Sequence, residues 1–525
     1  MLRDPQVLFA GAGLGLAEEI IEYREHQVEA IEWALEQEAP YLLINAPTGS
    51  GKTLLLATLG VLSKRTWTYL VGTKRLQDQV AKDFTGLPVL KGRGNFPCWL
   101  AEDAGRPDVT AAEGICVVDE WCQHTGMDGP EGEEAAPLCP YYAQRTEATT
   151  TGQRCTNYAM WLGYYPLRKV TRGYETTSML LADEAHGIED AVCDHAHLYV
   201  SARTAGRFGL VPPHTQDLDH WGNWAATHLK LLPKQKKGER PDFGLKTLRE
   251  TLTTLRNFDQ AQGNWLVEHE EHGTKFRPIW GAGLVVPKLI LPVGKVVMTS
   301  ATLMGADFYT DSLGLPEGSW AYLDIPSTFP ASHRPINYAP VVRMNAAAMV
   351  PGENAVRAKM QSAMDGIIDS YVGRGVISGL IHAVSKKYLA YILTESRYGF
   401  MMVSDPAEHE RRVRSGEASI LVAANLMEGW DGKDGLCRFI LMPKVPFPDL
   451  GDRRTKIRME EDSRSYDHKA LVAVVQGVGR GCRNTEDWCD SWILDENWRF
   501  IYAKRRGWLP RSFLDAYKHS VRLPA

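Results

Sequence analysis

Short apolar runs recur along the chain, and stretches with helix-like spacing of apolar residues lie between many of them. Over residues 26–37, Val28, Ile31 and Leu35 are spaced as on one face of an amphipathic helix. Further runs are typical of buried strands, at 41–45, 68–71, 179–182, 295–298, 376–381, 419–423, 439–442 and 491–494. Strands that alternate with helices predict an α/β fold with parallel sheets.

Two stretches interrupt this rhythm. Residues 91–156 are rich in Gly, Cys, Pro and acidic residues, and residues 200–285 are mixed, with a basic, loop-like segment at 233–238. We interpret both as insertions into a first α/β domain, and a second α/β domain is expected from about residue 336. The predicted segments are 1–90, 157–199 and 286–335 for the first domain, 91–156 and 200–285 for the insertions, and 336–525 for the second domain.

Size and charge narrow the class of protein. With 525 residues, and roughly 150 residues per domain, three or four domains are expected. The net charge of −5 argues against a protein that coats nucleic acid by bulk electrostatics, but it allows a basic groove. Neither a signal peptide nor a run of 18 apolar residues is seen, so we expect a cytoplasmic protein without a membrane span.

The segment 46–53, Ala-Pro-Thr-Gly-Ser-Gly-Lys-Thr, follows a predicted strand and precedes a predicted helix. This is the context of a loop that cradles the phosphates of ATP with backbone N–H groups. Lys52 would meet the β- and γ-phosphates, and the Thr53 hydroxyl would meet Mg²⁺. The expected nucleotide contacts are Thr48, Gly49, Ser50, Gly51, Lys52 and Thr53. By contrast, the glycines of segment 11–15 are interpreted as a flexible turn.

An acidic pair follows the predicted strand 179–182. Asp183, at the strand end, is placed to hold Mg²⁺, and Glu184 is placed to polarise a water molecule that attacks the γ-phosphate. Most catalysis of this kind is positioning and charge stabilisation, so the pair and the phosphate loop are expected to form one hydrolytic site.

Several further motifs are distributed along the chain. They are Arg-Glu-His-Gln at 24–27, Gly-Thr-Lys-Arg-Leu-Gln at 72–77, Thr-Ser-Ala-Thr-Leu at 299–303, Met-Glu-Gly-Trp-Asp-Gly at 427–432 with Val-Pro-Phe-Pro at 445–448, and Gln-Gly-Val-Gly-Arg-Gly-Cys-Arg at 476–483. With them, nearly the whole chain resembles the superfamily 2 helicases of the XPD/DinG type. The resemblance implies two RecA-like motor domains with ATP between them, a Cys-rich insertion and a small Arch-like insertion in the first.

The resemblance also implies roles for single residues. Arg24 and Gln27 would lie beside adenine, Asp431 would lie at the ATP and Mg²⁺ site, and Gln476 would act in catalysis. Arg480 and Arg483 are three residues apart, which predicts one shared helical face. From there both could reach the γ-phosphate across the cleft, as arginine fingers do.

Five cysteines fall within residues 98–155, in a chain without a secretion signal, which favours metal ligation over disulfides. In the family that the chain resembles, an insertion at this place often holds a [4Fe–4S] cluster. The resemblance assigns the ligands as Cys98, Cys116, Cys122 and Cys139, and it leaves Cys155 buried outside the set. Zn²⁺, which also accepts four cysteines, and the absence of a metal are the alternatives.

Contacts to a nucleic-acid backbone are expected from Thr73, Lys74 and Thr302, which lie at predicted strand ends or helix starts. Aromatic residues near the Cys-rich insertion could stack on bases, although ordinary packing is the alternative for each of Phe96, Trp99, Tyr141, Tyr142 and Trp161. The basic run Lys234, Lys236 and Lys237 is interpreted as a solvated loop.

The leading hypothesis is an ATP-dependent DNA helicase that moves along single-stranded DNA, with 5′→3′ polarity implied by the resemblance alone. Single-stranded or forked DNA is the expected partner, and the motor is expected to be a monomer. The first alternative is a DNA-stimulated ATPase that remodels nucleoprotein or serves as an effector subunit without strong unwinding. A phosphate-loop ATPase that does not bind nucleic acid is the second alternative, and it leaves the Thr-Ser-Ala-Thr and Gln-Gly-x-Gly-Arg segments unexplained.

Overall fold

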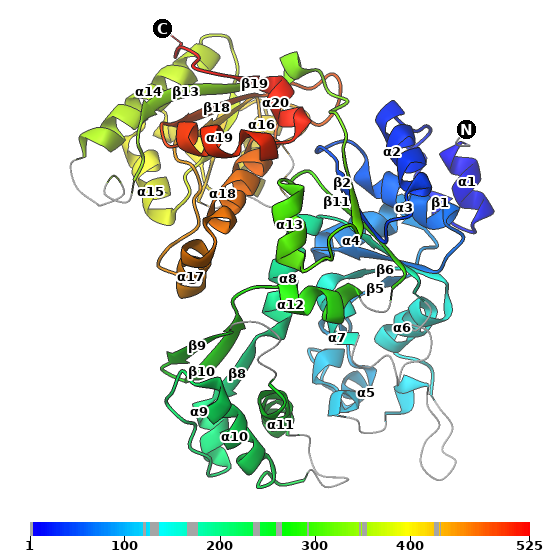
Figure 1. The fold of residues 1–525 in the computed structure, drawn as a ribbon. Coiled ribbons are helices and arrows are strands. Elements are labelled where there is room, and N and C mark those ends of the chain that lie inside the picture. The colour runs from blue at the N-terminus through cyan, green and yellow to red at the C-terminus, as the bar shows by residue number, and fades with distance from the viewer. Residues whose placement is uncertain are drawn as a thin grey trace.

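Two seven-stranded parallel sheets form two lobes, and two insertions extend from the first lobe (Figure 1). The computed structural model describes residues 4–118, 122–126, 136–164, 177–234, 242–258, 265–290, 293–345, 348, 354–424, 430 and 432–524. Within these ranges, no helix is long and apolar enough to cross a bilayer.

Lobe 1 holds the strand order β12-β2-β11-β7-β3-β6-β5, and every neighbouring pair is parallel. Its strands are β2 (Tyr41–Asn45), β3 (Trp67–Val71), β5 (Val89–Leu90), β6 (Gln153–Asn157), β7 (Met179–Ala182), β11 (Lys295–Ser300) and β12 (Trp320–Asp324). Its principal helices are α1 (Pro5–Gly11), α2 (Glu25–Glu36), α3 (Lys52–Leu62), α4 (Lys74–Asp83), α7 (Tyr158–Tyr164), α8 (Ile188–Ala196), α12 (Ala282–Val285) and α13 (Ala306–Leu313).

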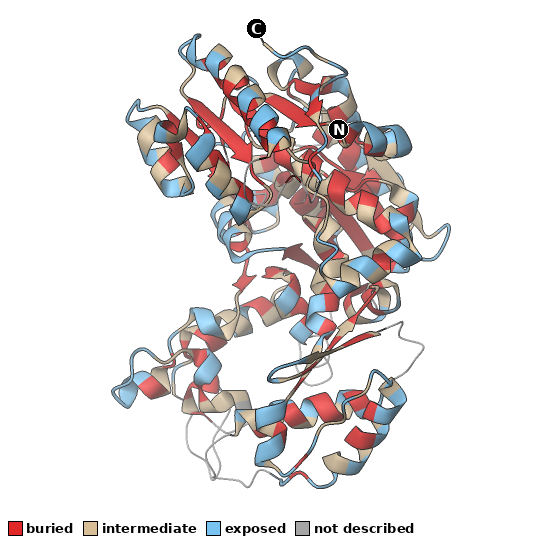
Figure 2. Ribbon diagram, turned by 90° about the vertical axis from the view of Figure 1, so that its left-hand side faces the viewer, coloured by how far each residue is buried: buried red, intermediate tan, exposed pale blue. Residues whose placement is uncertain are grey.

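Both faces of the lobe 1 sheet are covered. Leu42 and Ile44 of β2 pack into one hydrophobic cluster, whereas Leu43 between them packs into a second cluster on the other face. Because side chains alternate across a strand, a sheet that is buried on both sides needs apolar residues at every position. The central strands are accordingly buried along their length (Figure 2).

Lobe 2 repeats this architecture with the order β15-β16-β14-β17-β18-β13-β19, again parallel throughout. Its strands are β13 (Ile336–Val342), β14 (Ser378–His382), β15 (Met402–Val403), β16 (Ser419–Ala423), β17 (Phe439–Met442), β18 (Asp490–Asp495) and β19 (Tyr517–Lys518). Its helices are α14 (Ala355–Val372), α15 (Lys386–Glu395), α16 (Pro406–Arg414), α17 (Arg453–Glu461), α18 (Ser463–Val478), α19 (Trp498–Arg505) and α20 (Arg511–Ala516).

The first insertion lies between β5 and β6 and contains α5 (Trp99–Asp103), α6 (Pro140–Thr150) and short 3₁₀ turns. The second follows α8 and contains a three-stranded antiparallel sheet, β8 (Leu198–Ser201), β9 (Trp265–Glu270) and β10 (Gly273–Pro278). It also contains α9 (Ala202–Arg207), α10 (Leu218–Leu229) and α11 (Phe243–Arg256), which pack on a core of their own. The two insertions touch where Lys246 Nζ donates to the Val117 carbonyl at 2.7 Å.

The two-sheet α/β class predicted from the sequence is confirmed, and each predicted strand lies within two residues of an observed one. The predicted run at 376–381 begins later, at Ser378. Short edge strands such as β5, β15 and β19 were not predicted, because two residues carry too little periodicity to stand out.

Candidate nucleotide site and the cleft between the lobes

The phosphate loop joins β2 to α3. Gly49 and Gly51 have φ angles of 78° and 75°, a left-handed conformation that glycine adopts without strain. Gly51 is the N-cap of α3, so the backbone N–H groups of the loop and the positive end of the helix face the same point. The Ser50 hydroxyl is buried and lacks a hydrogen-bond partner among the described residues. These features fit a phosphate group in the loop.

Two side chains from the start of α2 hold this loop in place. Gln27 is buried, and its amide nitrogen donates to the Gly51 carbonyl at 3.0 Å. Arg24 Nη1 donates to the Gly49 carbonyl, and the Arg24 N–H donates to Gln27 Oε1 at 2.8 Å. Arg24 and Gln27 were expected beside adenine. Their observed contacts are with the phosphate loop itself.

An aromatic ring from the segment that connects the lobes covers the loop. A Cβ atom on Gly49 would lie 2.5 Å from two carbons of the Phe329 ring. Phe329 is buried, and the Arg24 guanidinium lies 6.0 Å from its ring centroid. The interlobe connection therefore touches the phosphate loop directly, at a residue that has no room for a side chain.

Asp183 lies at the end of β7, where its carboxylate is held by three donors. They are the Tyr69 hydroxyl at 3.2 Å, the Thr299 hydroxyl at 3.3 Å and the Glu184 N–H at 2.8 Å. Burial raises the pKa of Asp183, and the negative charge of Glu184 raises it further. Keeping a buried carboxylate ionised costs free energy unless a cation lies nearby. Asp183 is therefore suited to a position beside a cation.

Glu184 faces the phosphate loop and adopts a left-handed backbone, with φ at 47°. Its carboxylate lies 3.9 Å from Lys52 Nζ and 3.3 Å from His186 Nδ1. Burial alone would raise the pKa of Glu184. The Lys52 charge, the hydrogen bond from His186 and then the Arg480 charge lower that pKa well below its usual range. Glu184 is therefore an anion, which suits a group that accepts a hydrogen bond from water.

A chain of hydrogen bonds connects this carboxylate to lobe 2. The Gln476 amide donates to His186 Nε2 at 2.8 Å, and His186 Nδ1 lies 2.8 Å from Ser300 Oγ. Ser300 Oγ in turn donates to Glu184 at 3.3 Å. Residues from segment 183–186, from the Thr-Ser-Ala-Thr segment and from lobe 2 thus share one hydrogen-bond network.

The prediction that Arg480 and Arg483 share a helical face is wrong. Helix α18 ends at Val478, and both arginines lie in the irregular segment after it, because glycines at 479 and 481 do not favour continuing the helix. Arg480 is nevertheless close enough to lower the pKa of Glu184 across the cleft. The Arg483 carbonyl lies 3.5 Å from the point where a Gly49 Cβ would be, so this segment meets the phosphate loop.

The three residues predicted to contact a nucleic-acid backbone differ in exposure. Thr73, the N-cap of α4, and Lys74 are exposed. Thr302 has no exposed surface, and its hydroxyl is hydrogen-bonded to Ser300 Oγ at 3.2 Å. The contact of Thr302 with a nucleic-acid backbone therefore stays a prediction, at a residue that is fully buried in this structure. Asp431, predicted at the ATP site, lies outside the described residues, as do Lys236 and Lys237 of the basic run; Lys234 is exposed.

The four candidate cysteines gather in the first insertion. Cys98, Cys122 and Cys139 are buried and Cys116 is half-buried, and the Sγ atoms of Cys98 and Cys116 lie 3.3 and 3.5 Å from the point where a Gly114 Cβ would be. Burial raises the pKa of Cys116 and of Cys122, and each of these pKa values is raised further by the other cysteines of the set. In the described parts of the chain, no three ligand side chains are placed to hold a metal ion as they stand. Cys155 is fully buried in β6, apart from this set.

Three of the aromatic side chains near this insertion pack in the interior. Trp161 is fully buried and its Nε1 donates to the Leu289 carbonyl at 3.0 Å, while Tyr141 and Tyr142 form a small core with Cys139. Phe96 and Trp99 lie against that core, half-buried. Packing thus accounts for the three buried rings, and stacking on bases stays a prediction for Phe96 and Trp99.

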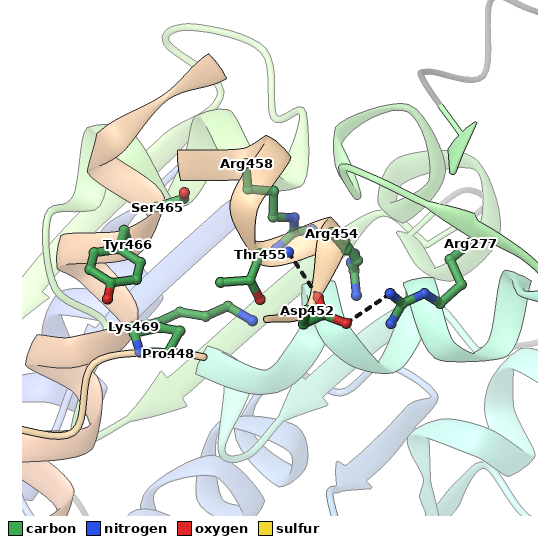
Figure 3. Close-up of a pocket in the computed structure, with 9 residues that line it drawn as sticks. All are labelled: Arg277, Pro448, Asp452, Arg454, Thr455, Arg458, Ser465, Tyr466 and Lys469. Atoms are coloured by element: carbon green, nitrogen blue, oxygen red, sulfur yellow. Dashed lines mark hydrogen bonds and ion pairs between the residues drawn. The ribbon is translucent and has the colours of Figure 1, made fainter. Parts of the chain in front are cut away.

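A charged junction joins the lobes away from the nucleotide site. Four cationic side chains line a cavity of about 190 Å³ at this junction (Figure 3). They are Arg277 of β10, Arg454 and Arg458 of α17, and Lys469 of α18. Arg277 pairs with Asp452 at 2.8 Å, Lys469 pairs with Asp190 at 2.9 Å, and Arg458 pairs with Glu189 at 2.5 Å. Each pair links lobe 2 to α8 or to the second insertion.

Sequence reasoning missed several residues of the site. Tyr69 and Phe329 belong to no motif, and His186, two residues after Glu184, was given no role. Asn45 was also missed, although its Oδ1 accepts from the Leu303 N–H at 3.0 Å and its Nδ2 donates to Asp324 at 2.8 Å. A polar residue at the end of an otherwise apolar strand was the one available signal for Asn45.

Comparisons with known proteins agree with this geometry. Residues 390–513 match the family described as helicase C-terminal domain, and residues 20–92 match the family described as type III restriction enzyme, res subunit. A solved XPD helicase superposes with a TM-score of 0.59 at 14% identity, over 93% of this chain and 98% of that one. Xpd4 of S. tokodaii gives 0.56 at 13%, over 92% and 97%, and an XPD structure described as apo gives 0.55 at 14%, over the same shares. The curated protein sequences contain no match.

Proposed function

Because this chain belongs to helicase superfamily 2 and has the XPD-type fold, we propose that it is an ATP-driven motor that moves along single-stranded DNA in the 5′→3′ direction and unwinds duplexes. The helicase C-terminal family that matches residues 390–513 and the res-subunit family that matches residues 20–92 support use of ATP and Mg²⁺. DNA as the substrate and the polarity belong to the proposal.

One observation carries it: groups from both lobes act on the same carboxylate. Lys52 and His186 of lobe 1 and Arg480 of lobe 2 all lower the pKa of Glu184. A nucleotide in the phosphate loop would therefore lie between lobes that both contact its reacting end. Hydrolysis would then change the contacts that hold the lobes together, which is how a two-lobed motor converts chemistry into movement.

The roles of the residues follow from their positions. Glu184 would accept a hydrogen bond from the attacking water and orient it, while Lys52 would stabilise the phosphate charge as it develops. Arg480 would add positive charge only when lobe 2 is closed, which favours the transition state over an open ground state. Thr53 and Asp183 would hold Mg²⁺, which would supply positive charge to neutralise the phosphates.

The ATPase is tested by Lys52→Ala and Glu184→Gln, with Lys64→Ala as the control. Lys64 is exposed and follows the end of the same helix α3, so it reports on the loss of a lysine without loss of the site. We expect the first two variants to lose stimulation of ATP hydrolysis by single-stranded DNA, and the control to retain it. Full stimulated turnover in Lys52→Ala would refute the proposed function.

Polarity and substrate need a separate measurement. Duplexes with a single 5′ or 3′ overhang, made of DNA or of RNA, distinguish the four cases, and we expect unwinding of the DNA duplex with the 5′ overhang. Thr73 and Lys74, which are exposed at the start of α4, are the proposed contacts to the phosphate backbone. Preferred unwinding from a 3′ overhang would contradict the proposed direction.

We further propose a [4Fe–4S] cluster held by Cys98, Cys116, Cys122 and Cys139. The donor set fits: four thiols gather in one insertion, and each negative charge there would disfavour the others unless a metal neutralised them. Such a group would cross-link an insertion whose own core is small. Zn²⁺ is the alternative, because it accepts the same four ligands.

A second candidate function is remodelling of nucleoprotein without strong unwinding. The observation that favours it is the modest second insertion, which has three strands and three helices in its described part. A forked duplex decides between the two: strand separation supports the helicase, whereas DNA-stimulated ATP hydrolysis without separation supports the remodeller.

A further inference from the structure

The lobes also meet just beyond the Thr-Ser-Ala-Thr segment. Met304 follows this segment in lobe 1, yet its fully buried side chain packs into the hydrophobic cluster of lobe 2 with Tyr338, Met442 and Val474. The backbone at this point is held from lobe 2 as well, because His468 Nε2 donates to the Met304 carbonyl at 3.1 Å.

Aromatic rings close the same contact. The ring of Phe308 in α13 stacks on Trp508 of lobe 2 at 5.6 Å between centroids, with 16° between the planes, and it lies 5.2 Å from His468. Gly305 has a left-handed φ of 58°, and a Cβ there would lie 2.6 Å from the Trp508 ring. The two lobes are thus fitted together at this point without space for a side chain.

We propose that His468 is a positioning residue that couples movement of lobe 2 to the Thr-Ser-Ala-Thr segment. The inference rests on the proposed motor function and adds a second link to the one between Gln476 and His186. His468 and Gln476 both belong to α18, about 12 Å apart along its axis. A helix moves as a rigid element, so α18 carries the His468 and Gln476 contacts to lobe 1 together, along with the Lys469–Asp190 pair.

The chemical state of the imidazole suits this role. Burial lowers the pKa of His468 to about 4. The hydrogen bond to Met304 and the charge of Asp190 raise this pKa by smaller amounts, whereas His186 and Lys469 lower it further. The ring is therefore neutral near pH 7, and its single proton must lie on Nε2 to donate to the Met304 carbonyl. The link holds one fixed hydrogen bond throughout the working pH range.

The experiment compares how many base pairs are separated for each ATP hydrolysed. We choose this ratio because a loss of folded protein lowers both quantities together and leaves the ratio unchanged. His468→Ala should lower the ratio about fivefold, the factor that corresponds to one buried hydrogen bond, while the kcat for ATP changes less than about twofold. His468→Gln, whose amide can donate to the same carbonyl, should recover most of the ratio.

His409 provides the matched control. It is also a buried histidine with a hydrogen bond to a backbone carbonyl, that of Leu436 at 2.8 Å, but its hydrogen-bond partners among the described residues lie within lobe 2. His409→Ala should lower thermal stability and leave the ratio at the wild-type value. An unchanged ratio in His468→Ala, an equal loss in His409→Ala, or no recovery in His468→Gln would each overturn the proposal.

The failure of the motor function itself gives a different result. If the wild-type protein separates no duplex, the proposed unwinding is refuted, and hydrogen exchange tests the link instead. A non-hydrolysable ATP analogue should then protect the amides of residues 300–305 in the wild type and in His409→Ala, but not in His468→Ala. Equal protection in all three proteins would overturn the link.

Discussion

The Gln476 amide in lobe 2 donates a 2.8 Å hydrogen bond to His186 Nε2 in lobe 1. These residues are 290 positions apart, and the bond connects the segment that carries Arg480 to the segment that carries Glu184. Because this bond spans the cleft, it exists only while the lobes are closed, and it lets the state of the nucleotide site influence the position of lobe 2.

Removal of either partner should therefore slow stimulated ATP hydrolysis. Gln476→Ala and His186→Ala should each lower its kcat by about five- to tenfold, since one hydrogen bond made only in the closed state is lost. Since both changes remove the same bond, the double variant should fall less than about twofold below the worse single variant. Losses that simply multiply would show that the two residues act independently.

The cysteine set can be tested without an activity assay. Protein purified without oxygen should hold about four iron atoms per chain and absorb visible light. Cys98→Ser should lose iron and colour. Cys155→Ser is the matched control, because that thiol is fully buried in β6, and burial with the Asp183 charge raises its pKa. Wild-type protein that contains zinc instead of iron would contradict the proposed cluster.

The contact between Gly49 and Phe329 predicts the effect of a single methyl group. Gly49→Ala would place a Cβ 2.5 Å from the Phe329 ring and on a left-handed backbone, so ATP affinity should fall at least about tenfold. The double variant that combines Gly49→Ala with Phe329→Ala should recover only part of the lost ATP affinity, because the backbone strain at residue 49 persists. Titration with a fluorescent ATP analogue measures both values.

Gly366 supplies the control for that substitution. It lies within α14, and a Cβ there meets nothing within 4 Å. Gly366→Ala should keep wild-type ATP affinity and raise the free energy of unfolding by up to about 1 kcal/mol. Wild-type ATP affinity in Gly49→Ala would show that the loop can shift away from the ring.

The charged junction predicts unequal effects from two cations of α17. Arg458 is buried and pairs across the lobes with Glu189, whose side chain is 13% exposed, whereas Lys456 and Glu460 form an exposed pair within the helix at 3.9 Å. Arg458→Ala leaves a largely enclosed carboxylate without its main cation and should lower the free energy of unfolding by up to about 3 kcal/mol. Lys456→Ala should change it by less than about 0.5 kcal/mol. Urea unfolding measures the difference, and similar effects would contradict the interpretation.

His382 predicts a pH dependence of stability. It is buried at the end of β14, and this burial lowers its pKa to about 4. The hydrogen bond to the Gly477 carbonyl raises the pKa of His382 by a smaller amount, and the charge of Arg480 lowers it. The unfolded histidine, with a pKa near 6.5, takes up a proton that the folded one does not. His382 therefore makes its full contribution to the free energy of unfolding above about pH 6.5. About 2–3 kcal/mol of that contribution is lost as the pH falls towards 4.5.

The measurement is urea unfolding between pH 7.5 and 4.5. His382→Gln should be less stable than the wild type near pH 7, yet its stability should fall less steeply with acid, because it lacks the group that titrates. A slope equal to that of the wild type would show that His382 does not contribute to the pH dependence.

Much of this protein is determined by local sequence. The strands are recognisable because a sheet covered on both faces requires continuous apolar runs, as in Leu42, Leu43 and Ile44. The phosphate loop is recognisable because its glycines, Lys52 and Thr53 must be adjacent to cradle a phosphate. Asp183 and Glu184 are recognisable because they follow a strand directly. In each case neighbours in the chain perform the chemistry together.

Tertiary structure decided what happens between distant segments. The sequence predicted Arg480 and Arg483 on a helix, but glycines end α18 before them. Thr302, predicted to contact a nucleic-acid backbone, is fully buried, which the sequence did not indicate. The Phe329 ring over Gly49 and the His468 bond to Met304 carried no signal in the sequence. These contacts join residues more than 150 positions apart, so they depend on how two separately folded lobes pack, which no local pattern specifies.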